Sequence, residues 1–141
     1  MKLIEKRKND LYTQVRPSIE KIVCDTFNCN CVLLPDGVIR KVGNFDPMYR
    51  HSLADLDYGF KIRRAGYKIF ISESYVGVCN RNSSKNSWRD TSLTRLERIR
   101  KKESIKGSPF KQWFYFMNKN FGFLTAVRYS ISPYIRIVLG K

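Results

Sequence analysis

The residues best suited to chemistry are two aspartates, Asp55 and Asp57, close to the expected start of a helix. They follow a loop over residues 44–50 and fall in the first helical turn. The positive end of the helix dipole stabilises a negative charge there by about 0.3–1 kcal/mol. We therefore expect Asp55 to be ionised at neutral pH and able to accept a proton from a substrate hydroxyl. Ordinary helix capping remains open as an alternative role.

Several elements must position these carboxylates. We expect their helix to be capped by Ser52 and to end at Gly66. A helical turn over residues 36–42 precedes it. Strands are predicted on either side, over residues 32–34, 67–71 and 75–79. A strand, helix and strand joined by short turns are typical of an α/β layer.

The C-terminal part is predicted to be helical and basic. A basic helix is expected over residues 92–103, with a thin apolar stripe. Pro109 opens a second helix, whose apolar residues recur with helical spacing up to Phe121. A third apolar segment over residues 124–138 is interrupted by Pro133. The apolar face over 110–121 suits either internal packing or contact with a membrane interface, and both remain open.

Composition narrows the class of protein. The chain has 141 residues, of which 43% are hydrophobic, so it can bury a core and wholesale disorder is disfavoured. No run of 18 apolar residues is present, and residues 1–10 lack the apolar segment of a secretory signal. These features predict a cytoplasmic protein of about one domain, with a possible peripheral position at the inner face of the membrane.

Positive charge is concentrated in the second half of the chain. The net charge is +15, and residues 81–141 hold 14 basic and 3 acidic residues. An acidic partner is therefore expected: nucleic acid, an anionic membrane or a phosphorylated substrate. A nucleic-acid-binding module is one alternative function, although no helix-turn-helix, zinc-finger or RNA-binding motif supports it. A non-catalytic partner subunit is another.

The cysteines indicate no metal site. Cys24, Cys29, Cys31 and Cys79 are accompanied by a single histidine, His51, and lack the paired spacing of a zinc site. We interpret them as reduced thiols.

Several motifs together resemble a known family. They are Cys-Asp-Thr-Phe-Asn from Cys24, Gly-x-Phe-Asp from Gly43, Asp-x-Asp-Tyr-Gly from Asp55 and Arg-Ala-Gly-Tyr-Lys from Arg64. Over residues 22–121 this order resembles the C-terminal, acceptor-side half of a family 2 glycosyltransferase of the GT-A fold. The resemblance implies part of a Rossmann-like sheet with covering helices over residues 1–87. A basic, aromatic helical tail would follow over 88–141.

The resemblance also implies roles for particular residues. Asp55 would be the catalytic base and Asp57 a second acidic residue near the acceptor. Asn28, Asn30 and Trp88 would contact the acceptor. The implied reaction transfers a sugar, with inversion, from a nucleotide sugar to a hydroxyl of a glycan or lipid-linked acceptor, as in cell-surface polysaccharide synthesis. Ser87 stands before Trp88, so the Gln-x-x-Arg-Trp pattern of processive synthases is absent.

The family's nucleotide-binding half has no counterpart in this sequence. That half carries an Asp-x-Asp motif that holds Mg²⁺ or Mn²⁺ on the diphosphate. Here the sole Asp-x-Asp is Asp55-x-Asp57, at the acceptor position. We therefore expect the chain alone to bind nucleotide sugars weakly and to be inactive without such a half. It would associate with that half or with itself.

Overall fold

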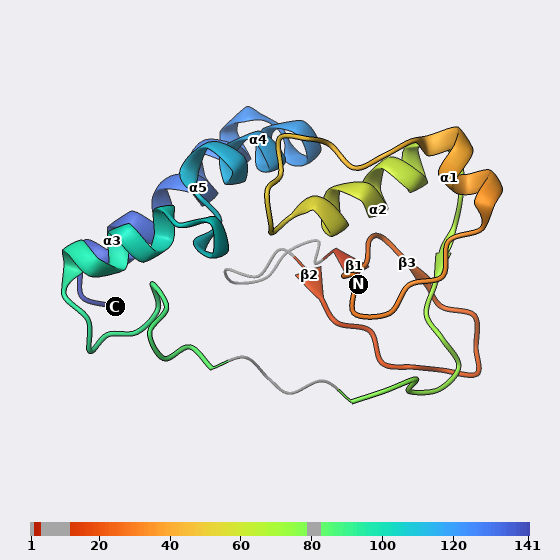
Figure 1. Ribbon diagram of the computed structural model, residues 1–141, viewed down its shortest axis with the longest axis horizontal. Coiled ribbons are helices and arrows are strands. Elements are labelled where there is room, and N and C mark those ends of the chain that lie inside the picture. The colour runs from red at the N-terminus through yellow and green to blue at the C-terminus, as the bar shows by residue number, and fades with distance from the viewer. Residues whose placement is uncertain (1, 4–11, 79–82) are drawn as a thin grey trace. The chain divides into compact units, whose positions relative to one another are not determined.

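The described part of the chain combines helices with short pairs of strands. The computed structural model describes residues 2–3, 12–78 and 83–141 (Figure 1). The strands are β1 (Lys2–Leu3), β2 (Tyr12–Thr13), β3 (Val23–Cys24) and β4 (Ile69–Phe70). The helices are α1 (Asp36–Val42), α2 (Ala54–Arg64), α3 (Arg95–Glu103), the 3-10 turn η1 (Ile105–Gly107), α4 (Phe110–Phe121) and α5 (Phe123–Val138). The fold is therefore mixed α/β, as the sequence predicted.

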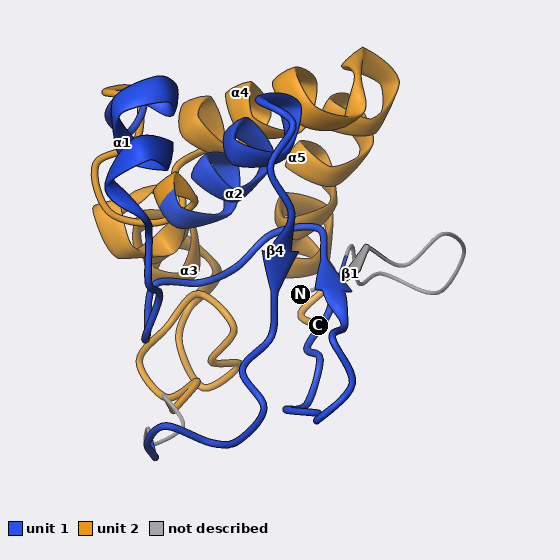
Figure 2. Ribbon diagram, turned by 90° about the vertical axis from the view of Figure 1, so that its right-hand side faces the viewer, with its two compact units in different colours: residues 1–46, 55–80 blue, residues 47–54, 81–141 orange. Residues whose placement is uncertain are grey.

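The chain forms two compact units (Figure 2). Unit 1 comprises residues 1–46 and 55–80, and unit 2 comprises residues 47–54 and 81–141. This division reflects how compactly the segments pack and does not test which part of the chain is catalytic. The expected division into a catalytic part, 1–87, and a tail, 88–141, stays a prediction.

Unit 1 contains both strand pairs and the helices α1 and α2. β1 pairs with β2 and β3 with β4, each antiparallel. Its core is built by side chains four residues apart, Val38 with Val42 on α1 and Tyr58 with Ile62 on α2. This spacing places each pair on one helix face, so each helix presents an apolar stripe. Phe27 completes the buried cluster.

Two predicted strands are absent. Residues 32–34 belong to no ladder, and Leu33 is 95% exposed, so a strand covered on both faces was the wrong expectation. Val32 and Leu34 do pack on the unit 1 core, so the side chains alternate as in a strand although no neighbouring strand pairs with them. Residues 75–78 likewise belong to no strand, and they are exposed. Cys79 lies outside the described residues.

The start of α2 differs from the prediction, whereas its end agrees with it. Leu53 precedes the helix with φ 74°, and the Ser52 hydroxyl hydrogen-bonds the Ser108 hydroxyl at 2.9 Å. Ser52 is therefore not the cap. Gly66, with φ 91°, follows the helix and its N–H donates to the Arg63 carbonyl at 2.9 Å. Glycine reaches this left-handed conformation at little steric cost, which explains why the helix ends here.

Unit 2 is helical. Thr94 and Glu97 form a capping box, and α3 begins at Arg95, three residues later than predicted. The expected apolar stripe is seen only in part: Leu93 and Ile99 are half-buried, whereas Leu96 is 58% exposed. Arg98 and Lys102 are buried instead.

The helices α4 and α5 pack on each other and meet at Gly122. The Trp113 indole N–H donates to the Tyr129 carbonyl at 3.1 Å, and Phe116, Met117, Ala126 and Ile137 are buried. Pro133 lies inside α5 without ending it. In the described part of the chain, no helix combines the length and the apolar character needed to cross a bilayer.

Candidate functional site

Asp55 lies in the first turn of α2 with both carboxylate oxygens engaged by backbone N–H groups. Oδ2 accepts from the Cys29 N–H at 3.2 Å, and Oδ1 accepts from the Leu56 N–H at 2.9 Å. The side chain is half-buried. A carboxylate offers about four acceptor positions, so two remain for a substrate hydroxyl. The two hydrogen bonds fix its orientation, which a general base requires.

The bond to Cys29 brings Asp55 together with the expected acceptor segment. Asn28 and Asn30 flank Cys29 and are both exposed. Partial burial, and secondarily the negative charge of Asp55, raise the pKa of the Cys29 thiol. Amide groups at 28 and 30 and a carboxylate at 55 therefore belong to one part of unit 1. Sequence spacing could not have found the Cys29 contact, because a backbone N–H has no residue-type signal.

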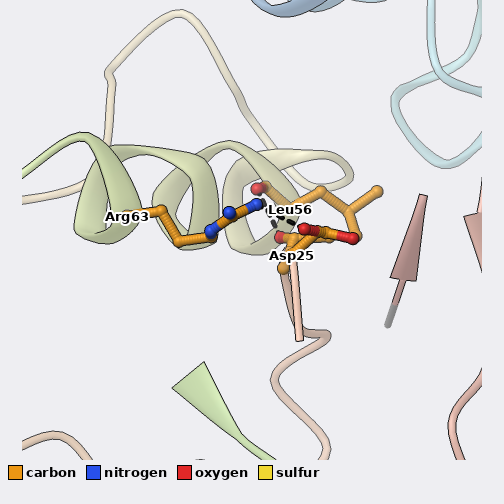
Figure 3. A network of polar contacts seen from close by, with 4 residues as sticks. Asp25, Leu56 and Arg63 are labelled. Atoms are coloured by element: carbon orange, nitrogen blue, oxygen red, sulfur yellow. Dashed lines mark hydrogen bonds and ion pairs between the residues drawn. The ribbon is translucent and has the colours of Figure 1, made fainter. Parts of the chain in front are cut away.

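Further contacts hold the segment before Asn28 against α2. The Thr26 hydroxyl donates to the Leu56 carbonyl at 2.7 Å, and Asp25 forms an ion pair with Arg63. Figure 3 shows Arg63 extending from α2 toward Asp25, beside Leu56. Gly59 permits this approach, because a Cβ at that position would lie 2.3 Å from Thr26 Oγ1 and 2.9 Å from Thr26 Cα. The glycine is thus needed for close packing rather than for a turn.

Asp57 occupies a different environment from Asp55. It is 1% exposed, although it is only two residues further along α2. Two residues correspond to about 200° of helical rotation, so the two carboxylates point in different directions. Asp57 therefore has no surface to offer an acceptor in this conformation, and its expected role in acceptor contact stays a prediction.

Trp88 belongs to unit 2 and lines a groove there. The groove has a volume of about 1360 Å³ and is bordered by the segments 83–89 and 101–107. Its lining includes four serines, the cationic residues Arg89, Lys101 and Lys106, and the acidic residue Glu103. The Arg89 guanidinium lies 5.1 Å from the centroid of the Trp88 ring. Aromatic, hydroxyl and charged groups of both signs together suit a polar ligand.

Arg98 positions Trp88 and was not anticipated from the sequence. Its Nε donates to the Trp88 carbonyl at 2.9 Å, and its NH2 group donates to the Lys141 carbonyl at 2.6 Å. Arg98 is 2% exposed, so these charge-assisted bonds compensate for its burial. A basic helix is normally expected to be solvated, and for that reason the pattern over α3 gave no indication of a buried arginine.

Potential metal ligands do not form a large cluster in the described residues. No group of three or more His, Cys, Asp or Glu side chains in residues 2–3, 12–78 and 83–141 could hold a metal ion.

No protein-family model, curated protein or solved structure matches this sequence.

Proposed function

We propose that unit 1 provides the acceptor side of an inverting glycosyltransferase, with a partial GT-A-like arrangement and Asp55 as the base. The observation that carries the proposal is the Asp55 carboxylate, which is oriented by the Cys29 and Leu56 N–H groups and remains half-buried. It belongs to the same part of unit 1 as the exposed amides of Asn28 and Asn30. Amide side chains donate and accept hydrogen bonds, as sugar hydroxyls do.

The reaction follows from these groups. Asp55 takes the proton of an acceptor hydroxyl while that oxygen forms a bond to the anomeric carbon of the nucleotide sugar. The bond from this carbon to the diphosphate oxygen breaks, and the nucleoside diphosphate leaves with the electron pair. Attack from the opposite face inverts the anomeric centre. No step is assigned to a metal or to Asp57.

Trp88 is proposed to bind part of the acceptor in the unit 2 groove. Its indole offers an apolar face on which a sugar ring can pack, while the hydroxyls and cations around it suit the polar edge of the sugar.

Asp55→Asn tests the proposal because it removes the base with little change of shape. The chain is reconstituted with a nucleotide-binding half, and release of nucleoside diphosphate is measured with UDP-, GDP- and dTDP-sugars, Mn²⁺ and a panel of glycan and lipid-linked acceptors. We expect Asp55→Asn to lower turnover by about 10²–10⁴-fold. Asp36→Asn is the matched control, because Asp36 also lies in a first helical turn but is exposed and paired with Arg40. Its turnover should equal that of the unaltered chain.

Acceptor binding gives a second readout if the chain alone does not turn over. Ligand-observed NMR with the acceptor panel should detect glycan binding that Trp88→Ala weakens and Asp36→Asn does not. Unchanged turnover in Asp55→Asn would reject Asp55 as the base. Absence of both turnover and glycan binding would reject the glycosyltransferase proposal.

A further inference from the structure

One side of α5 is an apolar stripe that no described part of unit 2 covers. Large side chains recur along it at i, i+7, i+11 and i+14, which places them on one helix face. These residues are Leu124, Ile131, Ile135 and Val138, and we call them the α5 stripe. Their exposed fractions lie between 44% and 83%.

The α5 stripe is separate from the face of α5 that packs within unit 2. The packed face contains Ala126, Ser130 and Ile137, which are at most 1% exposed. On a helix with about 100° per residue, the centre of this face lies about 130° around the helix from the centre of the stripe. The helix is therefore apolar on two sides, and packing against α4 and α3 accounts for one of them.

The charge around the stripe indicates which kind of surface it would contact. Residues 104–141 contain no Asp or Glu and six Lys or Arg residues. Arg128 lies within the stripe itself, four residues after Leu124 and three before Ile131. An arginine in this position can bury its aliphatic stem in an apolar medium while its guanidinium reaches an anionic headgroup. A second copy of this chain would bring the same positive charge against it.

From these observations we infer that α5 docks on the surface of a bilayer containing anionic lipid. The helix would lie in the plane of the interface, with the α5 stripe below the headgroups and Arg128 at their level. The inference is independent of the proposed glycosyltransferase activity, because it rests on no residue of that site. It also differs from the sequence-based expectation, which placed the apolar face on α4. There, Phe110 and Phe114 contact Tyr134 and Phe123 of α5.

Vesicle sedimentation with the full chain tests the inference. Vesicles of phosphatidylcholine are compared with vesicles in which part of the lipid is phosphatidylserine. Leu124→Ser/Ile135→Ser should weaken binding to both by about tenfold or more, because two exposed apolar side chains lose their burial in lipid. Leu33→Ser is the matched control, since Leu33 is a leucine on unit 1 that is even more exposed than Leu124, at 95% against 83%. It should bind as the unaltered chain does.

Arg128→Gln separates the electrostatic contribution to vesicle binding from the contribution of the apolar side chains. It should weaken binding to phosphatidylserine vesicles by about fivefold and leave phosphatidylcholine binding nearly unchanged, because one cation near an anionic surface contributes about 1 kcal/mol. Circular dichroism of each variant checks that the fold is retained. Equal binding of Leu124→Ser/Ile135→Ser and Leu33→Ser would overturn the inference. Failure of the unaltered chain to bind anionic vesicles would also overturn the inference, and this includes the outcome in which the chain dimerises through the stripe instead.

Discussion

At the scale of residues, the contact between Asp55 and Cys29 links the proposed base to the segment that we propose contacts the acceptor. The Oδ2 atom of Asp55 accepts from the Cys29 N–H, and the same carboxylate helps to raise the pKa of the Cys29 thiol. A negative charge disfavours the thiolate, so removing that charge lowers the thiol pKa.

Asp55→Asn is therefore expected to increase the rate at which iodoacetamide alkylates Cys29 at mildly alkaline pH. The thiolate is the reactive form, and its fraction increases when the thiol pKa falls. Mass spectrometry of the modified peptides measures Cys29 directly. Cys31, which is exposed, provides the internal reference. An unchanged ratio of Cys29 to Cys31 labelling would show that the carboxylate does not act on this thiol in solution.

At the scale of elements, the approach of residues 25–27 to α2 depends on Gly59. Gly59→Ala should destabilise unit 1 by about 3 kcal/mol, because the new Cβ would overlap both the side chain and the backbone of Thr26. This clash outweighs the gain of about 0.5–1 kcal/mol that alanine normally brings to a helix. Urea unfolding followed by circular dichroism measures the change.

Gly37→Ala is the matched control, since Gly37 lies in α1 and a Cβ there meets nothing within 4 Å. It should be neutral or stabilising by up to about 1 kcal/mol. If both alanine variants unfolded at the same urea concentration, the close packing of Thr26 on α2 would be absent in solution.

The helices and strands also show where sequence patterns were sufficient to predict the structure and where they were not. The α2 helix was predicted correctly at its C-terminal end, because the left-handed conformation at Gly66 is encoded locally by a glycine. The strand over 32–34 was wrong, because an apolar run predicts burial but cannot supply a neighbouring strand. Within the candidate site, Asp55 could be selected from its place in a first helical turn. Its contact with Cys29 joins residues 26 positions apart and has no local signal.

At the scale of the whole molecule, the dominant property is the positive charge of residues 81–141. Repulsion among these cations opposes folding and is screened by salt, since the Debye length falls from about 30 Å at 0.01 M to about 8 Å at 0.15 M. Both tryptophans, Trp88 and Trp113, lie in unit 2, so their fluorescence reports on this part of the protein.

We expect the thermal midpoint followed by tryptophan fluorescence to rise when sodium chloride is raised over this range. Sodium chloride is chosen over sulfate, which also strengthens apolar burial. A midpoint that stayed constant or fell with added chloride would mean that repulsion does not limit the stability of unit 2.

The sequence by itself determined the mixed α/β class, the helical basic C-terminal region and Asp55 as the candidate base. Each of these depends on local composition, spacing or a residue's own conformational preference. Tertiary structure decided that Asp57 and Arg98 are buried, that Cys29 binds Asp55, and that the α5 stripe is uncovered within the described part of unit 2. Burial and pairing depend on residues distant in the chain, so the same aspartate or arginine can be solvated in one fold and enclosed in another.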